Sequence, residues 1–191
     1  MSEDDAFVNA VTSLSDAVLL QQFVEGDEAS FEALFHRHYD LVYGVLFRLT
    51  GTREEAEDLA QEVFLKLYDR PLRRAESLSG WLYRVATNTG YNALKAAQRR
   101  LKREQQGGEG LIQVDDLPEE EVTRRETRQR VQAVLARIPA RSAKLLVLRQ
   151  SGFSYQELAE IIGVAPSSIG TLLARAEEAF AATYQAMHEE K

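Results

Sequence analysis

Apolar residues recur every three or four positions along most of the chain, and no stretch alternates apolar and polar residues over the length of a strand. This period is typical of amphipathic helices and not of β-strands, so the chain is predicted to be all-α. The first expected helix is capped by Ser15 and ends at Gly26, because serine accepts at helix starts and glycine favours helix ends. Asp27 is expected to cap a longer helix that ends at Gly51.

Two further helices are expected before residue 105. Thr52 and Glu55 have the T-x-x-E spacing of a capping box, which predicts the start of a third helix. Pro71 marks its end, because proline cannot continue a helical hydrogen-bond ladder. After the loop RPLRRAESLS, a fourth helix is expected to begin near Gly80.

Residues 105–118, QQGGEGLIQVDDLP, contain three glycines and a proline and have no helical period. This composition predicts a flexible linker. The chain is therefore expected to form two small helical domains, over residues 14–104 and 119–188, joined by residues 105–118.

The second domain is predicted to end in a helix-turn-helix. Helices are expected from Glu120 to about Arg137 and through RSAKLLVLRQ. Ser154 and Glu157 then form a second capping box before a short helix, a tight turn containing Gly163, and a last helix over about 167–187. A short helix, a glycine turn and a longer helix are the elements of a helix-turn-helix.

Composition excludes several kinds of site. The chain has a net charge of −7, an acidic N-terminus and no run of apolar residues long enough for a membrane helix, so it is expected to act in the cytoplasm without membrane insertion. The absence of cysteine excludes disulfides, zinc–thiolate sites and a thiol nucleophile. His36 and His38 would diverge on a helix, so neither a metal nor another cofactor is predicted.

One helix concentrates positive charge although the chain is acidic. Residues 80–103, GWLYRVATNTGYNALKAAQRRLKR, contain no Asp or Glu. Side chains at helical spacing place cations and amides on one face: Arg84, Asn88, Asn92, Lys95 and Arg99. Cations suit phosphates and amides suit base edges, so this face is a candidate DNA surface, with a merely solvated face as the alternative. Trp81 is expected to anchor the core, with stacking on a base as its alternative.

Three stretches in order give a specific resemblance: DLAQEVFLKLYDR, GWLYRVATNTGYNALKAAQRR and, after the linker, SYQELAEIIGVAPSSIGTLLARA. Together they resemble a bacterial extracytoplasmic-function sigma factor over about residues 14–185. The resemblance implies a four-helix domain and a helix-turn-helix domain in a non-catalytic subunit that directs RNA polymerase to promoters.

The resemblance also implies roles for individual residues. In the family, the helix carrying D-x-x-Q-E binds the clamp of the largest polymerase subunit, and Asp58, Gln61, Glu62 and Leu65 match it here. They would share one face, separate from the apolar stripe of Leu59, Val63 and Leu67. The residues implied in contact with the −10 promoter element are Arg73, Arg74, Ser77, Leu78, Trp81, Arg84, Asn88, Asn92, Lys95, Arg99 and Arg100.

The last helix would bind the −35 element as duplex, through Ser167, Ser168, Thr171 and Arg175. Gly170, Leu172 and Glu177 stand where the family commonly has Lys, Arg and Arg. Fewer phosphate contacts release fewer counterions, so lower affinity and weaker salt dependence are expected at this element.

Other functions stay open from the sequence. A stand-alone helix-turn-helix regulator would bind duplex DNA without polymerase, and a sigma-like decoy would occupy an anti-sigma factor, which is a common partner in the family. An enzyme is the least favoured class. The carboxylates of Glu54, Glu55, Glu57 and Asp58 crowd one helix start without a histidine, cysteine or glycine loop beside them.

Overall fold

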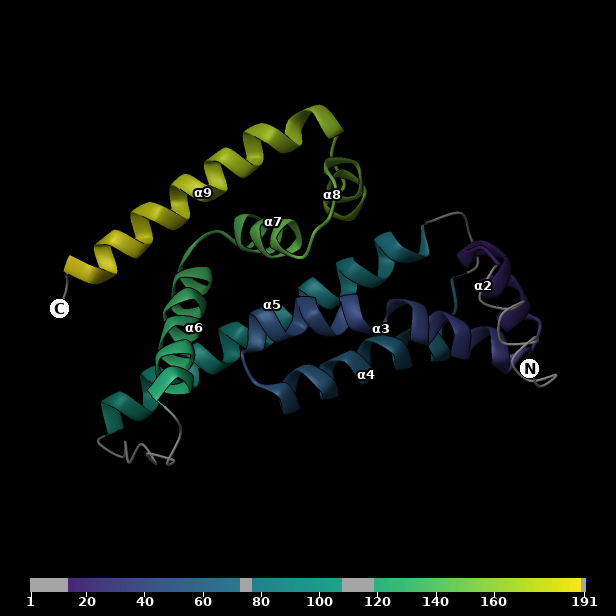
Figure 1. Cartoon of the computed structure of the whole chain (residues 1–191), viewed down its shortest axis with the longest axis horizontal. Coiled ribbons are helices and arrows are strands. Elements are labelled where there is room, and N and C mark those ends of the chain that lie inside the picture. Colours follow the sequence, from purple (N-terminus) through teal and green to yellow (C-terminus); the bar gives the residue numbers. More distant parts are fainter. Residues whose placement is uncertain (1–13, 73–76, 108–118, 190–191) are drawn as a thin grey trace.

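The computed structural model describes residues 14–72, 77–107 and 119–189, and all regular structure within these ranges is helical (Figure 1). The helices described there are α2 (Asp16–Val24), α3 (Glu28–Thr50), α4 (Arg53–Asp69), α5 (Leu78–Gly107), α6 (Glu119–Arg137), α7 (Ala140–Gln150), α8 (Tyr155–Ile162) and α9 (Pro166–Glu189). The all-α prediction is confirmed. Below, α2–α5 are called the N-terminal half and α6–α9 the C-terminal half.

In the N-terminal half, the long helix α5 lies along α3 and α4, and α2 covers one end of the bundle (Figure 1). Leucine and valine side chains with 0% exposure fill the space between these helices: Leu34, Val42, Val45, Leu46, Leu49, Val63, Leu67 and Leu82. Helix α3 packs tightly on α5 at Gly90, where an added Cβ would lie 2.8 Å from Cδ1 of Leu49. Glycine therefore permits the close approach of the two helices.

The helix ends follow the predicted capping residues, except that neither Asp27 before α3 nor Thr52 before α4 makes a side-chain capping hydrogen bond. The hydroxyl of Ser15 accepts a hydrogen bond from the Val18 amide at 3.4 Å, and Gly51 ends α3 in the left-handed conformation, with φ +80°. Thr52 occupies the N-cap position of α4, but its side chain makes no capping hydrogen bond. The capping box predicted there is wrong, because the Thr52 hydroxyl does not accept a hydrogen bond from the backbone amides at the start of α4.

The fourth helix also differs from its predicted bounds. Helix α5 begins at Leu78, slightly earlier than Gly80, because the Ser77 hydroxyl accepts a hydrogen bond from the Gly80 amide at 3.3 Å. At its other end α5 continues to Gly107, so the first three residues of the expected linker are helical. The remaining linker residues, 108–118, lie outside the described residues.

In the C-terminal half, α8 and α9 form the predicted helix-turn-helix and are bent by 88° at their junction. The second capping box is confirmed: the Ser154 hydroxyl accepts from the Glu157 amide at 3.3 Å, and the Glu157 carboxylate accepts from the Ser154 amide at 2.7 Å. Gly163 ends α8 with φ +75°, a conformation that favours glycine. The caps at its two ends therefore determine where the short helix α8 begins and ends.

The two halves pack against each other through one continuous buried cluster. The rings of Tyr83 on α5 and Phe153, just before α8, meet edge to face with centroids 4.6 Å apart. The division into separate domains therefore stays a prediction. No single helix in the described ranges is long and apolar enough to cross a membrane; only α8 and α9 combined reach such a length and composition, across their 88° bend.

Candidate nucleic-acid and protein-binding surfaces

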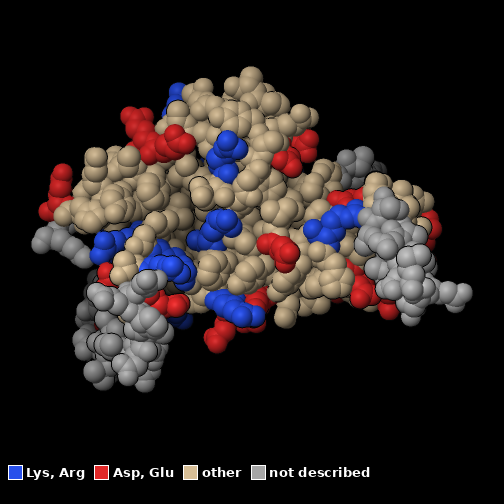
Figure 2. Space-filling model, viewed as in Figure 1, with Lys and Arg blue, Asp and Glu red and all other residues tan. Residues whose placement is uncertain are grey.

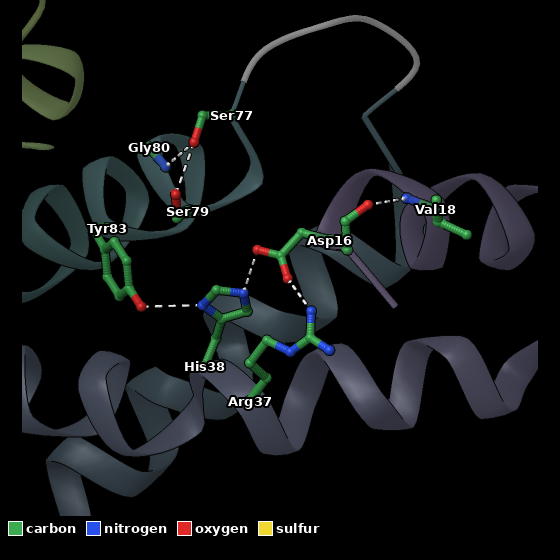
Figure 3. A network of polar contacts seen from close by, with 9 residues as sticks. Asp16, Val18, Arg37, His38, Ser77, Ser79, Gly80 and Tyr83 are labelled. Atoms are coloured by element: carbon green, nitrogen blue, oxygen red, sulfur yellow. Dashed lines mark hydrogen bonds and ion pairs between the residues drawn. The ribbon is translucent and has the colours of Figure 1, made fainter. Parts of the chain in front are cut away.

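A buried polar network fixes the start of α5 on the bundle (Figure 3). His38 of α3 is 6% exposed, and its Nε2 lies 2.8 Å from Oδ2 of Asp16 at the start of α2. Because a carboxylate only accepts, Nε2 donates, and in the neutral ring Nδ1 accepts from the Tyr83 hydroxyl at 3.0 Å. Arg37 also donates to Asp16, at 2.6 Å. The network joins α2, α3 and α5.

The same network shifts two pKa values. The hydrogen bond from His38 and the nearby Arg37 hold the pKa of Asp16 below its ordinary value, against the opposing effect of partial burial. Burial raises the pKa of the Tyr83 phenol above its ordinary range, with a smaller contribution from the Asp16 charge. The phenol therefore stays protonated and available as a donor to His38.

The sequence predicted a polar face on α5 made of Arg84, Asn88, Asn92, Lys95 and Arg99, called the α5 polar face below. Two of its cations bind the C-terminal half. Nε of Arg84 donates to the carbonyl of Ile161 at 3.2 Å, and Nζ of Lys95 donates to the carbonyl of Ala136 at 2.9 Å. Both acceptors lie in the last turn of their helices, α8 and α6.

Asn88 lies between these two cations and also contacts the C-terminal half. Its Oδ1 accepts a short hydrogen bond from Nζ of Lys144 on α7. The same ammonium lies 5.5 Å from the ring centroid of Tyr91. Partial burial lowers the pKa of Lys144. From the sequence Lys144 was expected to be a solvated surface charge that could add to the DNA contact, and its bond to Asn88 was not expected, since nothing in its spacing marks a partner 56 residues away.

The other residues of the α5 polar face, and the basic residues that follow them, face outward. Asn92, Arg99 and Arg100 are exposed, and Nε of Arg99 donates back to the Lys95 carbonyl in its own helix. Further along, Arg99, Lys102 and Arg103 line an open hollow of about 520 Å³. In Figure 2, Lys and Arg side chains gather in the middle and lower left, where α5, α6 and α7 meet. The positive charge is therefore local on an acidic molecule.

The residues expected before α5 have mixed positions. Arg73 and Arg74 lie outside the described residues, and Ser77 is the exposed N-cap. Leu78 was expected in the loop, but it is the first residue of α5 and is 4% exposed, because the helix begins earlier than predicted. Trp81 is half-buried and packs against the core, as expected of an anchor.

Helix α4 separates its two faces clearly. Asp58, Gln61, Glu62 and Leu65 are all exposed on one side, and the Leu65 side chain is 59% exposed. On the other side, Val63 and Leu67 are fully buried. The separation predicted from helical spacing is confirmed.

One residue extends the exposed face of α4 beyond the prediction. Tyr68 lies three positions after Leu65, is 44% exposed, and packs its ring against Phe23 and Phe31 at centroid distances of 5.4 and 5.1 Å. The available signal in the sequence was the spacing: Tyr68 follows Leu65 by three positions, which places both on the same face of a helix. The face is acidic at one end and apolar at the other.

The start of α9 presents small polar residues. Ser167, Ser168, Thr171 and Arg175 are exposed around the first turns. An added Cβ at Gly170 would meet only the Tyr155 ring, at 3.8 Å, so a side chain fits there. Within the described ranges, no group of three or more His, Asp or Glu residues could hold a metal ion.

Comparisons with known proteins agree on one family. The Sigma-70 region 2 model matches residues 34–100, and the Sigma-70, region 4 model matches residues 128–180. The ECF RNA polymerase sigma-E factor of Haemophilus influenzae is 31% identical over 180 residues, which cover 86% of this chain and 93% of that protein. The RNA polymerase sigma factor YlaC of Bacillus subtilis is 32% identical over 151 residues, which cover 77% and 87%.

A solved structure shares the fold. CnrH, in its complex with the cytosolic domain of CnrY, matches with a TM-score of 0.61 at 18% identity, covering 90% of this chain and 97% of CnrH.

Proposed function

This chain belongs to the extracytoplasmic-function sigma factors of RNA polymerase, and from that membership we propose how its surfaces divide the work of a sigma factor. Helix α4 binds core polymerase, the α5 polar face binds promoter DNA at the −10 element, and α9 meets the −35 element. The role is that of a non-catalytic specificity subunit acting on DNA in the cytoplasm.

The polymerase contact is assigned to the exposed face of α4. Asp58, Gln61, Glu62 and Leu65 are exposed on one side of the helix, which is held to the bundle from its opposite side by Val63 and Leu67. Carboxylates steer association with a basic surface, and Leu65 with Tyr68 supplies apolar area at the centre of the contact. The clamp of the largest polymerase subunit is the proposed partner surface.

The DNA contact is assigned to the α5 polar face and its basic continuation. Asn88 and Asn92 offer a donor and an acceptor to base edges, while Lys95, Arg99 and Arg100 offer charge to phosphates. Arg84 extends the same row toward the start of the helix. A strand opened by polymerase would lie along α5, where no carboxylate of residues 80–103 repels it.

The −35 contact is assigned to the first turns of α9. Ser167, Ser168 and Thr171 can meet phosphates together with the free amides of the helix start. Arg175 adds charge one turn later. The uncharged Gly170 and the acidic Glu177 make this contact weaker than the one on α5.

The observation that carries the assignment is the exposure pattern of α4. All four polymerase-matching residues are exposed on one side, and the apolar residues of the stripe pack inward on the other. Its test is co-elution of the purified chain with core RNA polymerase on a sizing column at moderate salt. We expect stoichiometric co-elution of the unchanged chain and loss of it for Asp58→Lys/Glu62→Lys. Glu54→Lys, an exposed residue at the start of the same helix, is the matched control and should co-elute.

Failure of the unchanged, folded chain to co-elute would favour the stand-alone regulator or the decoy described above. CnrH is known in complex with the cytosolic domain of CnrY. An anti-sigma partner for this chain remains a prediction, and co-purification of a small protein that blocks polymerase binding would be its first sign.

A further inference from the structure

A cavity of about 520 Å³ is lined by residues of α3, α6, α7 and α9. Its wall is mainly apolar and includes four half-buried side chains, Phe47, Val131, Leu146 and Phe180. Sites for small molecules are typically hollows of about 300–1,000 Å³ with apolar walls and a few polar groups. The cavity therefore has the size and the lining of a ligand site.

The cavity reaches the surface of the molecule. Three of the polar residues that line it, Arg48, Gln150 and Glu177, are exposed. A small solute can therefore enter it without unfolding of the surrounding helices.

Contacts beside the cavity hold its wall in place. Arg128 of α6 donates to the carbonyl of Gly51 at 3.1 Å, and its guanidinium carbon lies 4.8 Å from the Phe47 ring centroid. The buried Gln132, one turn later on α6, donates to the carbonyl of Leu49 at 3.2 Å. These contacts attach α6 to the end of α3 without any occupant in the cavity. A wall that is already ordered costs a ligand less affinity than one that must form on binding.

Positive charge prevails among the described residues that line the cavity. Arg48 of α3 and Arg128 of α6 both line it, together with the carboxylate of Glu177 on α9. The two arginines donate to backbone carbonyls, of Gly44 at 2.9 Å and of Gly51 at 3.1 Å. A guanidinium has five N–H donors, so both arginines keep donors for an anionic group. An anion is therefore favoured beside α3 and α6 and disfavoured beside Glu177.

We propose that this cavity binds a small amphipathic carboxylate, whose anionic group meets Arg48 and Arg128 and whose apolar body packs against Phe47, Leu146 and Phe180. The apolar wall disfavours a hydrophilic anion such as phosphate, and the excess of positive charge disfavours an amine. Arg48 and Arg128 belong to none of the surfaces assigned above to polymerase or DNA. The inference thus goes beyond the proposed function and does not depend on it.

Decanoate is the probe, because it joins a linear apolar chain to one carboxylate, and decanol is its uncharged counterpart. Calorimetric titration of the purified chain at pH 7, below the concentration at which decanoate forms micelles, should give saturable one-to-one binding. Decanol should bind about tenfold more weakly, because its hydroxyl makes no charge-assisted hydrogen bonds to the arginines.

Two variants separate the anionic group from the apolar body. Arg48→Gln, at an exposed position, should weaken decanoate binding about tenfold and leave decanol binding unchanged. Arg141→Gln is the matched control, because it removes one exposed positive charge from α7 outside the cavity. Val131→Phe should abolish binding of both compounds by filling the cavity. Arg48→Gln keeps the test decisive if Val131→Phe folds poorly.

Methyl NMR signals locate the bound decanoate. The signals of Val131 and Leu146 should shift during the titration, whereas those of Leu65, which is exposed on α4, should not. Equal shifts at Leu65 would show detergent-like binding to any apolar surface and would overturn the proposal.

Three further results would each overturn it: equal affinities for decanoate and decanol, an Arg48→Gln variant that binds decanoate like the unchanged chain, or no saturable binding at all. The last would leave the cavity to an apolar side chain of a protein partner. All of these measurements use the free chain, so a failure to co-elute with core polymerase would count against the proposed function alone.

Discussion

Oδ2 of Asp16, at the first turn of α2, lies 2.8 Å from Nε2 of the buried His38, and Oδ1 of the same carboxylate accepts from Arg37 at 2.6 Å. One carboxylate thus attaches α2 to α3 and, through the His38 ring and Tyr83, to α5. The neighbouring pair of Glu32 and His36 also joins a carboxylate to a histidine ring but is exposed, with 3.6 Å between Oε1 of Glu32 and Nε2 of His36. Comparing the two pairs therefore tests how much burial adds to the contribution of a carboxylate–histidine pair to the free energy of unfolding.

Asp16→Asn should lower the free energy of unfolding by about 1–3 kcal/mol at pH 7, because it removes charged hydrogen bonds to a buried partner. Glu32→Gln should change it by only a few tenths of a kcal/mol, as is usual for exposed pairs. Denaturant unfolding of both variants measures the difference. Equal effects would show that the network does not stabilise the start of α5.

The Asp16 contribution should depend on pH. The pKa of this carboxylate is lowered in the folded chain, so its stabilisation is present above the ordinary value of 3.8 and is lost as the pH falls through the lower folded pKa. The difference in stability between the unchanged chain and Asp16→Asn should therefore shrink below about pH 4. Unfolding curves between pH 7 and pH 3 would show it, and a difference that grows toward low pH would contradict this sign.

Ser154→Ala should cost about 1 kcal/mol, because α8 loses its N-cap acceptor and the partner of Glu157. The Ser154 hydroxyl and amide lower the pKa of Glu157, so part of this cost should disappear as the pH falls below the ordinary Glu value. Ser154→Thr keeps a capping hydroxyl and should retain most of the stability. Thermal unfolding of the three chains at pH 7 and pH 4 is the measurement.

Asn92→Ala should reduce promoter opening by on the order of tenfold, because an amide that pairs with a base edge is worth about 1–3 kcal/mol. Asn92 is exposed, so unfolding and co-elution with core polymerase should be unchanged. Transcription from a promoter that the complex recognises, measured beside co-elution, separates the two activities. Loss of co-elution in Asn92→Ala would contradict the assignment of α5 to DNA, because a residue of the DNA surface should not affect polymerase binding.

Gly170→Lys should strengthen binding of the chain to a promoter duplex and make the plot of log affinity against log salt steeper by about 0.9. The position has room for a side chain beside Tyr155. Gly170→Gln is the matched control, since it has the same gain in helix propensity without the charge. Equal slopes for the two variants would show that this turn of α9 does not meet a phosphate.

Local rules predicted most helices, and they failed where a hydrogen bond depends on how a side chain turns. Ser154 and Glu157 form the capping box that their spacing indicates, whereas Thr52 has the same spacing and makes no cap. Burial of the apolar stripe on α4 followed from helical period alone, because its partner is the core of the same bundle. The early start of α5 depended on Ser77, whose capping role had no distinguishing pattern.

The contacts between the two halves could not be predicted from the sequence. Arg84, Lys95 and Gln132 bond to backbone carbonyls 41 to 83 residues away, and every residue has a carbonyl, so the partner has no sequence pattern. His38 was considered only as a failed metal ligand, and its place between Asp16 and Tyr83 depends on three helices meeting. The sequence did predict that this face of α5 carries cations and amides, and that composition does not depend on which group binds to it.

The order of helices along the chain has a consequence for newly made molecules. The hydrogen bonds described above between the α5 polar face and the C-terminal half come from α6, α7 and α8, and these helices are synthesised after α5. At about 5–20 residues added per second, a growing chain spends on the order of seconds with α5 complete and its later partners unmade. During synthesis on the ribosome the α5 polar face is thus exposed before the later helices can cover it, so a growing chain presents positive charge that the finished molecule partly covers.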